Sequence, residues 1–174
     1  NPAAKLGGNP IMDPAKFTIS LEQADRLLRQ GVLHDAEALY REILDDTPGQ
    51  PNASQGLGLI ALHTGHASAA VELLQMASIG LPEDATIHTH LGLAFATARD
   101  ARSAEGCYRK AIAFANDFAD AHLNLANLLL ELGRIDEAAI EYEAAVSIAP
   151  ESGAVHYGMA MLELGRGRHG AAIT

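Results

Sequence analysis

Cysteine and tryptophan are almost missing from this sequence of 174 residues, which has one cysteine and no tryptophan. The single cysteine, Cys107, cannot form an internal disulfide, so we expect the reducing environment of the cytoplasm. No histidine lies near Cys107 in sequence to activate its thiol, which favours a structural role for this residue.

Positive charge is also scarce. The chain has 12 Lys and Arg against 22 Asp and Glu, which gives a formal net charge of -10 at pH 7. A protein that binds nucleic acid needs a basic surface to meet the phosphates, so we expect no nucleic-acid partner. One basic cluster is present, which would suit an acidic segment of a partner protein. It consists of Arg99, Arg102, Arg109 and Lys110.

Long apolar runs do not occur. No stretch of about 18 uncharged apolar residues is present, so we expect no membrane span. Residues 1–16 are rich in proline and glycine with scattered charge. This composition indicates a linker or a cloning scar rather than a helix or a secretory signal.

A repeat of 34 residues dominates what is present. Alanine recurs with this spacing at Ala36, Ala70, Ala104, Ala138 and Ala172. The register runs without insertions through repeats 17–50, 51–84, 85–118 and 119–152 and a partial repeat 153–174. Strict periodicity of this length in a helix-compatible sequence indicates a stacked repeat array, so we predict one domain over 17–174.

Each repeat is predicted to form a helical hairpin. With positions counted from the first residue of each repeat, positions 4, 7, 8 and 11 are apolar or small, the spacing of one helix face. Glycine follows at position 15, where a left-handed residue ends a helix, in Gly31, Gly65, Gly133 and Gly167. A second helix then ends before a proline such as Pro150, because the residue preceding proline avoids the helical region.

These residues resemble the tetratricopeptide repeat family. The fourth repeat matches its motif in Leu125, Ala126, Leu129, Gly133, Ala138, Tyr142, Ala145 and Pro150. The resemblance covers Phe17 to Thr174 and departs from the motif at Arg99, where glycine is usual. It implies an all-α fold, a right-handed α-solenoid of helix–turn–helix repeats with four complete and one partial, and a role in binding other proteins.

The surface opposite the apolar helix faces is the predicted binding groove. If positions 4, 7, 8 and 11 face the core, positions such as 2, 6, 9 and 13 point to the other side of the first helices. We predict that this groove binds a peptide or helix of a partner protein. Its residues are Asp25, Arg29, Gln55, Leu59, His63, Thr89, His90, Leu93, Leu123, Asn124, Asn127, Tyr157 and Met161.

Two patterns resemble chemical sites. Residues 56–61 fit the glycine pattern of a dinucleotide fingerprint, but no strand precedes them. His88, His122 and His156 share position 4, on helices that pack roughly 8 to 10 Å apart, whereas zinc needs ligands at about 2.0 to 2.1 Å. We therefore expect no metal, no cofactor and no catalytic residue, and we expect these histidine nitrogens to bond nearby polar groups.

Similarity to particular relatives leaves two functional classes open. Residues 118–127 resemble repeats of O-linked N-acetylglucosamine transferases, although only Asn124 matches their groove asparagines. Residues 39–44 resemble repeats that precede glycosyltransferase or sulfotransferase domains in bacterial proteins. The favoured class is a non-catalytic binding module, and the alternative is the substrate-recruiting region of a larger enzyme.

Self-association is a further expectation. A partial fifth repeat is predicted to expose an apolar edge near Met159, Met161, Leu162 and Ile173. Two copies are expected to meet either through this edge or by laying the arm Asn1 to Lys16 into a neighbour's groove across Leu59 and Leu93.

Overall fold

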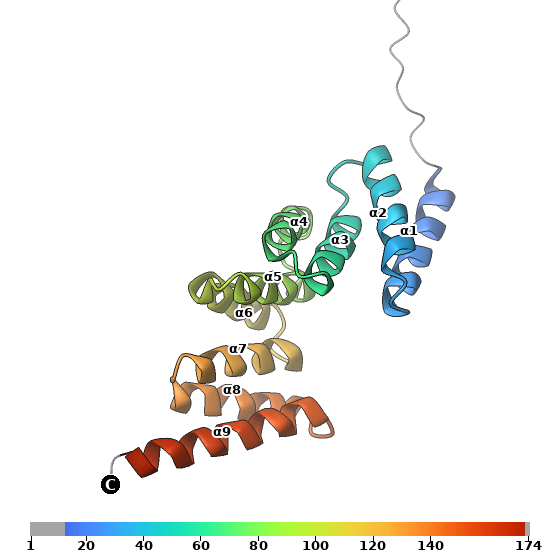
Figure 1. Cartoon of the computed structure of the whole chain (residues 1–174). Helices are drawn as coiled ribbons and strands as arrows, with labels where there is room; N and C mark the ends of the chain where they lie inside the picture. The colour runs from blue at the N-terminus through green and yellow to red at the C-terminus, as the bar shows by residue number, and fades with distance from the viewer. Residues whose placement is uncertain (1–12, 173–174) are drawn as a thin grey trace, which may run out of the picture. The chain divides into compact units, whose positions relative to one another are not determined.

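The computed structural model describes residues 13–172, and it contains no strand within that range. Its helices are α1 (Pro14–Arg29), α2 (Leu33–Asp46), α3 (Pro51–His63), α4 (Ala67–Gly80), α5 (Ala85–Thr97), α6 (Ala101–Phe114), α7 (Ala119–Glu131), α8 (Ile135–Ile148) and α9 (Gly153–Ala172), as Figure 1 shows. The predicted all-α class is confirmed. Helix α1 begins ahead of the predicted start at Phe17, because Asp13 caps it and a proline occupies its first turn.

The chain divides into two compact units. The N-terminal unit ends at Pro82 and contains the hairpins α1–α2 and α3–α4, with α3 in contact with both helices of the first hairpin. The C-terminal unit begins at Glu83 and contains the hairpins α5–α6 and α7–α8. Within it, α7 contacts α5 and α6, and α9 contacts α7 and α8. Each unit is thus a stack of helical hairpins.

The turns inside the hairpins follow the sequence prediction at three glycines. Gly31, Gly65 and Gly133 have φ angles of 76°, 80° and 74°, in the left-handed region that glycine enters without a steric penalty. In the third repeat Arg99 takes the same conformation, with φ of 66°. The turn geometry is therefore kept even where its usual residue is missing.

The predicted helix end at Gly167 is wrong. Helix α9 continues from Gly153 to Ala172, and Gly167 is not among the residues with positive φ. Glycine permits the left-handed conformation without imposing it. The fifth repeat is therefore one continuous helix over the described residues rather than a helix followed by the start of a second.

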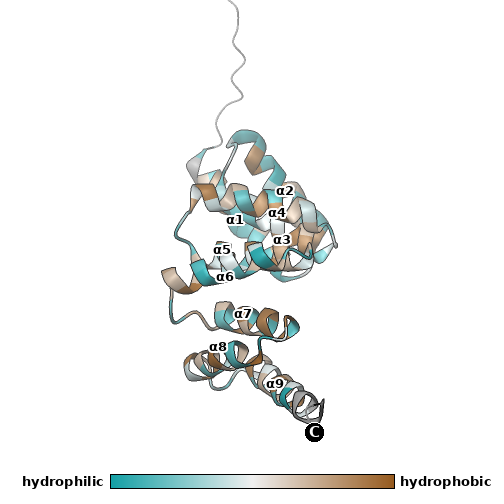
Figure 2. Ribbon diagram, turned by 90° about the vertical axis from the view of Figure 1, so that its left-hand side faces the viewer, coloured by the Kyte–Doolittle hydropathy of each residue, from teal (hydrophilic) through white to brown (hydrophobic). Residues whose placement is uncertain are grey.

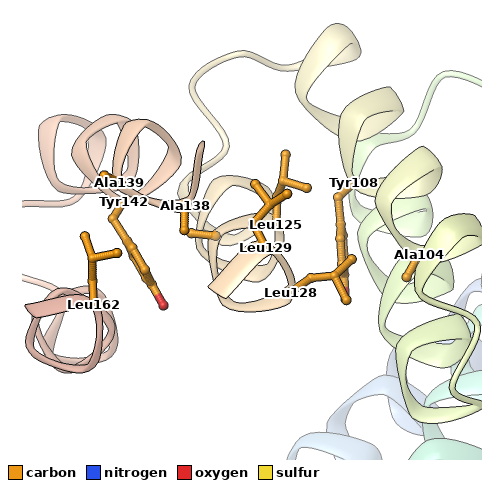
Figure 3. Close-up of a cluster of buried hydrophobic side chains, with 10 residues drawn as sticks. Ala104, Tyr108, Leu125, Leu128, Leu129, Ala138, Ala139, Tyr142 and Leu162 are labelled. Carbon is orange, nitrogen blue, oxygen red and sulfur yellow. The ribbon is translucent and has the colours of Figure 1, made fainter. Parts of the chain in front are cut away.

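Each unit has its own hydrophobic core. In the N-terminal unit Tyr40 and Ile43 of α2 are fully buried among residues of α1 and α3. In the C-terminal unit the ring of Tyr108 lies beside Leu128 of α7, and Tyr142 lies beside Leu162 of α9 (Figure 3). Helices α2, α6 and α8 therefore each supply a buried tyrosine, whereas α4 has Leu74 at the equivalent position.

Glycines at two positions of the repeat let these aromatic rings approach the backbone. A Cβ added to Gly92 would lie 2.5 Å from Cε1 of Tyr108 in the same hairpin. A Cβ on Gly56 would overlap the ring of Tyr40, and one on Gly158 would overlap the ring of Tyr142. Close packing of this kind requires that no side chain is present at these three residues.

Hydrophobic and hydrophilic residues are mixed along the helices (Figure 2). In the part of the chain that the structure describes, no helix is both long enough and apolar enough to cross a membrane.

Candidate binding groove

A pocket opens between α7 and α9 in the C-terminal unit, on the predicted groove side. Its volume is about 460 Å3. We call it the groove pocket, and its lining residues are Leu123, Asn127, Leu130, Glu131, Tyr142, Ala154, Tyr157, Gly158 and Met161. Four of them belong to the predicted groove set, so the structure brings these four together around one hollow.

Tyr142 forms the floor of the groove pocket. Its side chain extends from α8 to the pocket between α7 and α9. The ring has room there because Gly158 of α9 has no side chain. The Tyr142 hydroxyl donates a hydrogen bond to Oδ1 of Asn127 at 2.6 Å. Burial raises the pKa of Tyr142, so its hydroxyl remains a donor at neutral pH.

The rim of the groove pocket combines exposed apolar and polar groups. The Tyr157 side chain is 69% exposed and Met161 is 40% exposed. Asn127 and Glu131 lie on the exposed side of α7, one helical turn apart. Oδ1 of Asn127 accepts the tyrosine hydroxyl, and the amide nitrogen of the same side chain is a hydrogen-bond donor. The rim thus offers apolar surface, an amide donor and a carboxylate.

The same tyrosine arrangement recurs in the N-terminal unit. The Tyr40 hydroxyl donates to Oδ1 of Asp25 at 2.6 Å, and burial together with this bond raises the pKa of Tyr40. Of the other predicted groove residues on α1 and α3, Arg29 and His63 are exposed, whereas Gln55 and Leu59 are half-buried. The predicted groove positions of this unit are therefore more polar than the lining of the groove pocket.

The predicted groove residues on α5 differ among themselves in exposure. Thr89 is only 4% exposed, and its hydroxyl donates to the carbonyl of Ala85 at 2.8 Å. His90 is half-buried, and burial lowers its pKa. Leu93 is 40% exposed. On α7, Asn124 is half-buried and does not line the groove pocket.

The histidines at position 4 have structural roles. Nδ1 of His122 lies 2.7 Å from Oε2 of Glu141, and its Nε2 lies 3.2 Å from the Asn116 carbonyl. Nε2 of His156 lies 2.7 Å from the Pro150 carbonyl, while the His88 ring stacks on Phe114 at 5.4 Å between centroids. The predicted bonding to polar groups is confirmed for His122 and His156.

Over residues 13–172 no group of three or more His, Cys, Asp or Glu side chains is arranged to hold a metal ion.

Burial also bears on Cys107. It is partly buried on α6, and this burial raises the pKa of its thiol. A raised thiol pKa lowers the thiolate fraction at neutral pH, which agrees with the predicted structural role.

The predicted apolar edge is only partly exposed. Leu162 is 1% exposed and belongs to the core of the C-terminal unit, so its predicted exposure is wrong. Its side chain faces Tyr142, on the inner side of α9 (Figure 3). Leu164, at 58% exposed, lies on the outer side instead. The N-terminal arm before Asp13 and Ile173 lie outside the described residues.

Sequence reasoning missed a second pocket of about 460 Å3 in the N-terminal unit. It lies where α2 meets α3 and α4, and none of the predicted groove residues lines it. The signal that identifies it is the pair Ala61 and Ala69 at positions 11 and 19, where the other complete repeats have larger residues.

Comparison with known proteins supports the repeat assignment. Two family models, both described as tetratricopeptide repeat, match residues 21–85 and 95–162. No match was found among curated proteins.

Solved structures show the same fold. A crystal structure of MamA is 24% identical in sequence, with a TM-score of 0.73 over 90% of this chain and 86% of that chain. TTC0263, a thermophilic tetratricopeptide repeat protein of Thermus thermophilus, is 24% identical, with a TM-score of 0.75 over 87% of this chain and 84% of that chain. One chain of the APC/C Cut9–Hcn1 hetero-tetramer is 15% identical with a TM-score of 0.77, and the match covers 86% of this chain but 30% of that one.

Proposed function

Because the chain belongs to the tetratricopeptide repeat family, we propose that it is a protein-interaction module whose groove pocket binds a segment of a partner protein. The observation that carries this proposal is the hollow between α7 and α9, with its tyrosine floor and apolar rim. The proposal assigns binding and no catalytic step to the chain, in a cytoplasmic setting.

The lining of the groove pocket defines what it accepts. Leu123, Tyr157 and Met161 surround a space suited to one apolar anchor side chain of the partner. The Asn127 amide, held by Tyr142, donates to a main-chain carbonyl of the bound segment. Glu131, one turn further along α7, favours a basic residue next to the anchor. The preferred segment is therefore a short apolar and basic one.

The test is selection of peptides from a random displayed library on the purified chain, followed by affinity measurement with a single-site variant. Tyr157→Ala removes apolar surface at the rim and is expected to weaken the selected peptides about tenfold or more. Ile140→Ala on α8 is the matched control, because Ile140 is 65% exposed and lies outside the groove pocket. Peptides that bind both variants as well as they bind the original chain would contradict the proposal.

A second copy of the chain is a further candidate partner. Tyr157 and Leu164 on α9 are 69% and 58% exposed, and a second copy would cover this apolar surface. Light scattering on the full chain and on a chain lacking residues 1–12 separates the two predicted routes. Loss of the dimer on truncation supports insertion of the arm, and a dimer that survives truncation supports the α9 edge. A monomer in both cases excludes self-association.

A further inference from the structure

The second pocket lies in the N-terminal unit and is separate from the groove pocket. Its apolar floor contains Leu57, Ile60 and Leu73, and its rim contains Glu37, Arg41 and His66. Ala61, Thr64 and Ala69 complete the lining. The polar groups therefore stand at the edge of a mainly apolar hollow.

The lining of this pocket can be compared with the equivalent residues of another repeat in the same chain. Every lining residue has a counterpart 68 residues later, two repeats along, in the C-terminal unit. Glu37 and Arg41 correspond to the same residue types, Glu105 and Arg109. His66, however, corresponds to Arg134, and the small residues Ala61 and Ala69 correspond to Leu129 and Glu137.

In the C-terminal unit an arginine side chain fills the equivalent place. Nη1 of Arg134 donates to Oε2 of Glu105 at 2.7 Å, and its Nε and Nη2 donate to Glu137 at 2.7 and 2.6 Å. Arg109 donates to the other oxygen of Glu105, at 2.9 Å. The hydrogen bond from Arg134 is the main reason why the pKa of Glu105 lies below its ordinary value. Glu105 thus binds two guanidinium groups, one on each oxygen.

In the N-terminal unit only half of this arrangement is present. Nη2 of Arg41 pairs with Oε1 of Glu37 at 2.6 Å, as Arg109 pairs with Glu105. Nδ1 of His66 lies 2.9 Å from the Thr64 hydroxyl, so this shorter side chain is held at its own turn. Within the described residues Glu37 has Arg41 as its ion-pair partner through Oε1, and Glu37 lines the pocket. Its counterpart Glu105 carries a second guanidinium on Oε2.

We propose that this pocket is an arginine slot, which binds one arginine side chain of a partner protein. The guanidinium donates to Oε2 of Glu37, as Arg134 does to Glu105, while the methylene groups lie over Ile60 and Leu73. The surroundings favour a cation, because acidic residues outnumber basic ones in the N-terminal unit. The slot and the groove pocket share no lining residue, so the slot does not rest on the proposed groove function.

The test uses N-acetyl-arginine amide as the probe and the methyl NMR signals of Leu57, Ile60 and Leu73 as the readout. We expect saturable shifts of these signals with an affinity in the millimolar range, as suits one side chain. N-acetyl-leucine amide is the matched probe that fits the apolar floor without the charge. Absence of saturable shifts with the arginine probe, or equal binding of the leucine probe, would overturn the proposal.

Two variants locate the binding. Glu37→Gln keeps the shape of the side chain and removes its charge, so the arginine probe is expected to bind about fivefold more weakly or worse. The double variant His66→Arg with Ala69→Glu copies the residues of the C-terminal unit and is expected to fill the slot from within and abolish the shifts. Unchanged binding of the probe by Glu37→Gln contradicts the proposal even if the double variant fails to fold.

Discussion

Arg99 occupies the left-handed backbone conformation that glycine occupies in the equivalent turns of three other repeats. A side chain with a Cβ is crowded in this conformation, which costs roughly 1 to 2 kcal/mol per residue. The turn is kept because the two helices that it joins pack against each other. Ala104 of α6 is fully buried in this packing, and Tyr108 is almost fully buried. Arg99 therefore stores backbone strain that a glycine would release.

The first prediction concerns this strain. Arg99→Gly is expected to raise the free energy of unfolding by about 0.5 to 1 kcal/mol, since relief of the crowded conformation exceeds the extra freedom of glycine in the unfolded chain. Urea denaturation followed by circular dichroism measures the change. Arg102→Gly, which removes an arginine from the first turn of α6, is the control and is expected to destabilise the chain by up to about 1 kcal/mol. A destabilised Arg99→Gly variant would show that the Arg99 side chain contributes more than its backbone strain costs.

The second prediction compares two glycines that both lie inside helices. Gly92→Ala places a methyl group 2.5 Å from the buried ring of Tyr108 and is expected to cost about 1 to 3 kcal/mol. Gly106→Ala on α6 meets no atom within 4 Å and is expected to stabilise the chain by about 0.5 to 1 kcal/mol through helix propensity. Thermal unfolding of both variants measures the difference. Equal effects of the two substitutions would mean that the packing of α5 on α6 differs from that described.

At the scale of helices, the ion-pair network of α6 and α8 links stability to pH. Hydrogen bonds from Arg134 hold the pKa values of Glu105 and Glu137 below their ordinary value of 4.5. A carboxyl group whose pKa falls on folding stabilises the folded state above its unfolded pKa, and this contribution is lost as the pH falls through the folded pKa. The network therefore contributes stability at neutral pH that acid removes.

The third prediction follows from that sign. Arg134→Gln is expected to lower the melting temperature at pH 7 and to reduce its decrease between about pH 5 and about pH 3, because the two glutamates lose their main partner. Arg166→Gln is the matched control, since Arg166 forms one exposed ion pair with Glu163. Melting curves across this pH range measure the effect. If the melting temperature of Arg134→Gln falls with acid as much as that of the original chain, the network does not link stability to pH.

The helices and their turns were predictable because they depend on local patterns. The 34-residue spacing, the apolar positions and glycines such as Gly31, Gly65 and Gly133 give the hairpins directly. Gly167 was not predictable in the same way, because glycine allows a turn and leaves the choice to the packing around it. The repeat pattern therefore predicts where helices lie more reliably than where the last one ends.

The two pockets were harder to predict because they depend on combinations of distant residues. The groove pocket needs Tyr142, Asn127 and Gly158 together, since the ring must pass a position without a side chain to reach its acceptor. The arginine slot depends on three lining residues that are smaller than their counterparts 68 residues later in the C-terminal unit. Periodicity gave the face on which Leu123 and Tyr157 lie, and the structure was needed to show that they border one hollow.

At the scale of the whole molecule, two compact units each carry a pocket of their own. The groove pocket belongs to α7, α8 and α9, and the arginine slot belongs to α2, α3 and α4. The two pockets share no lining residue, so we propose one of them for an apolar anchor of a partner and the other for an arginine of a partner.

Photo-cross-linking shows most directly whether a partner segment lies in the groove pocket. The photoreactive amino acid p-benzoylphenylalanine is placed at Tyr157, or at Ile140 as the equally exposed control on α8, and each variant is irradiated with a library-selected peptide. We expect a covalent adduct from position 157 and none from position 140. A cross-link from position 140 with none from position 157 would contradict it.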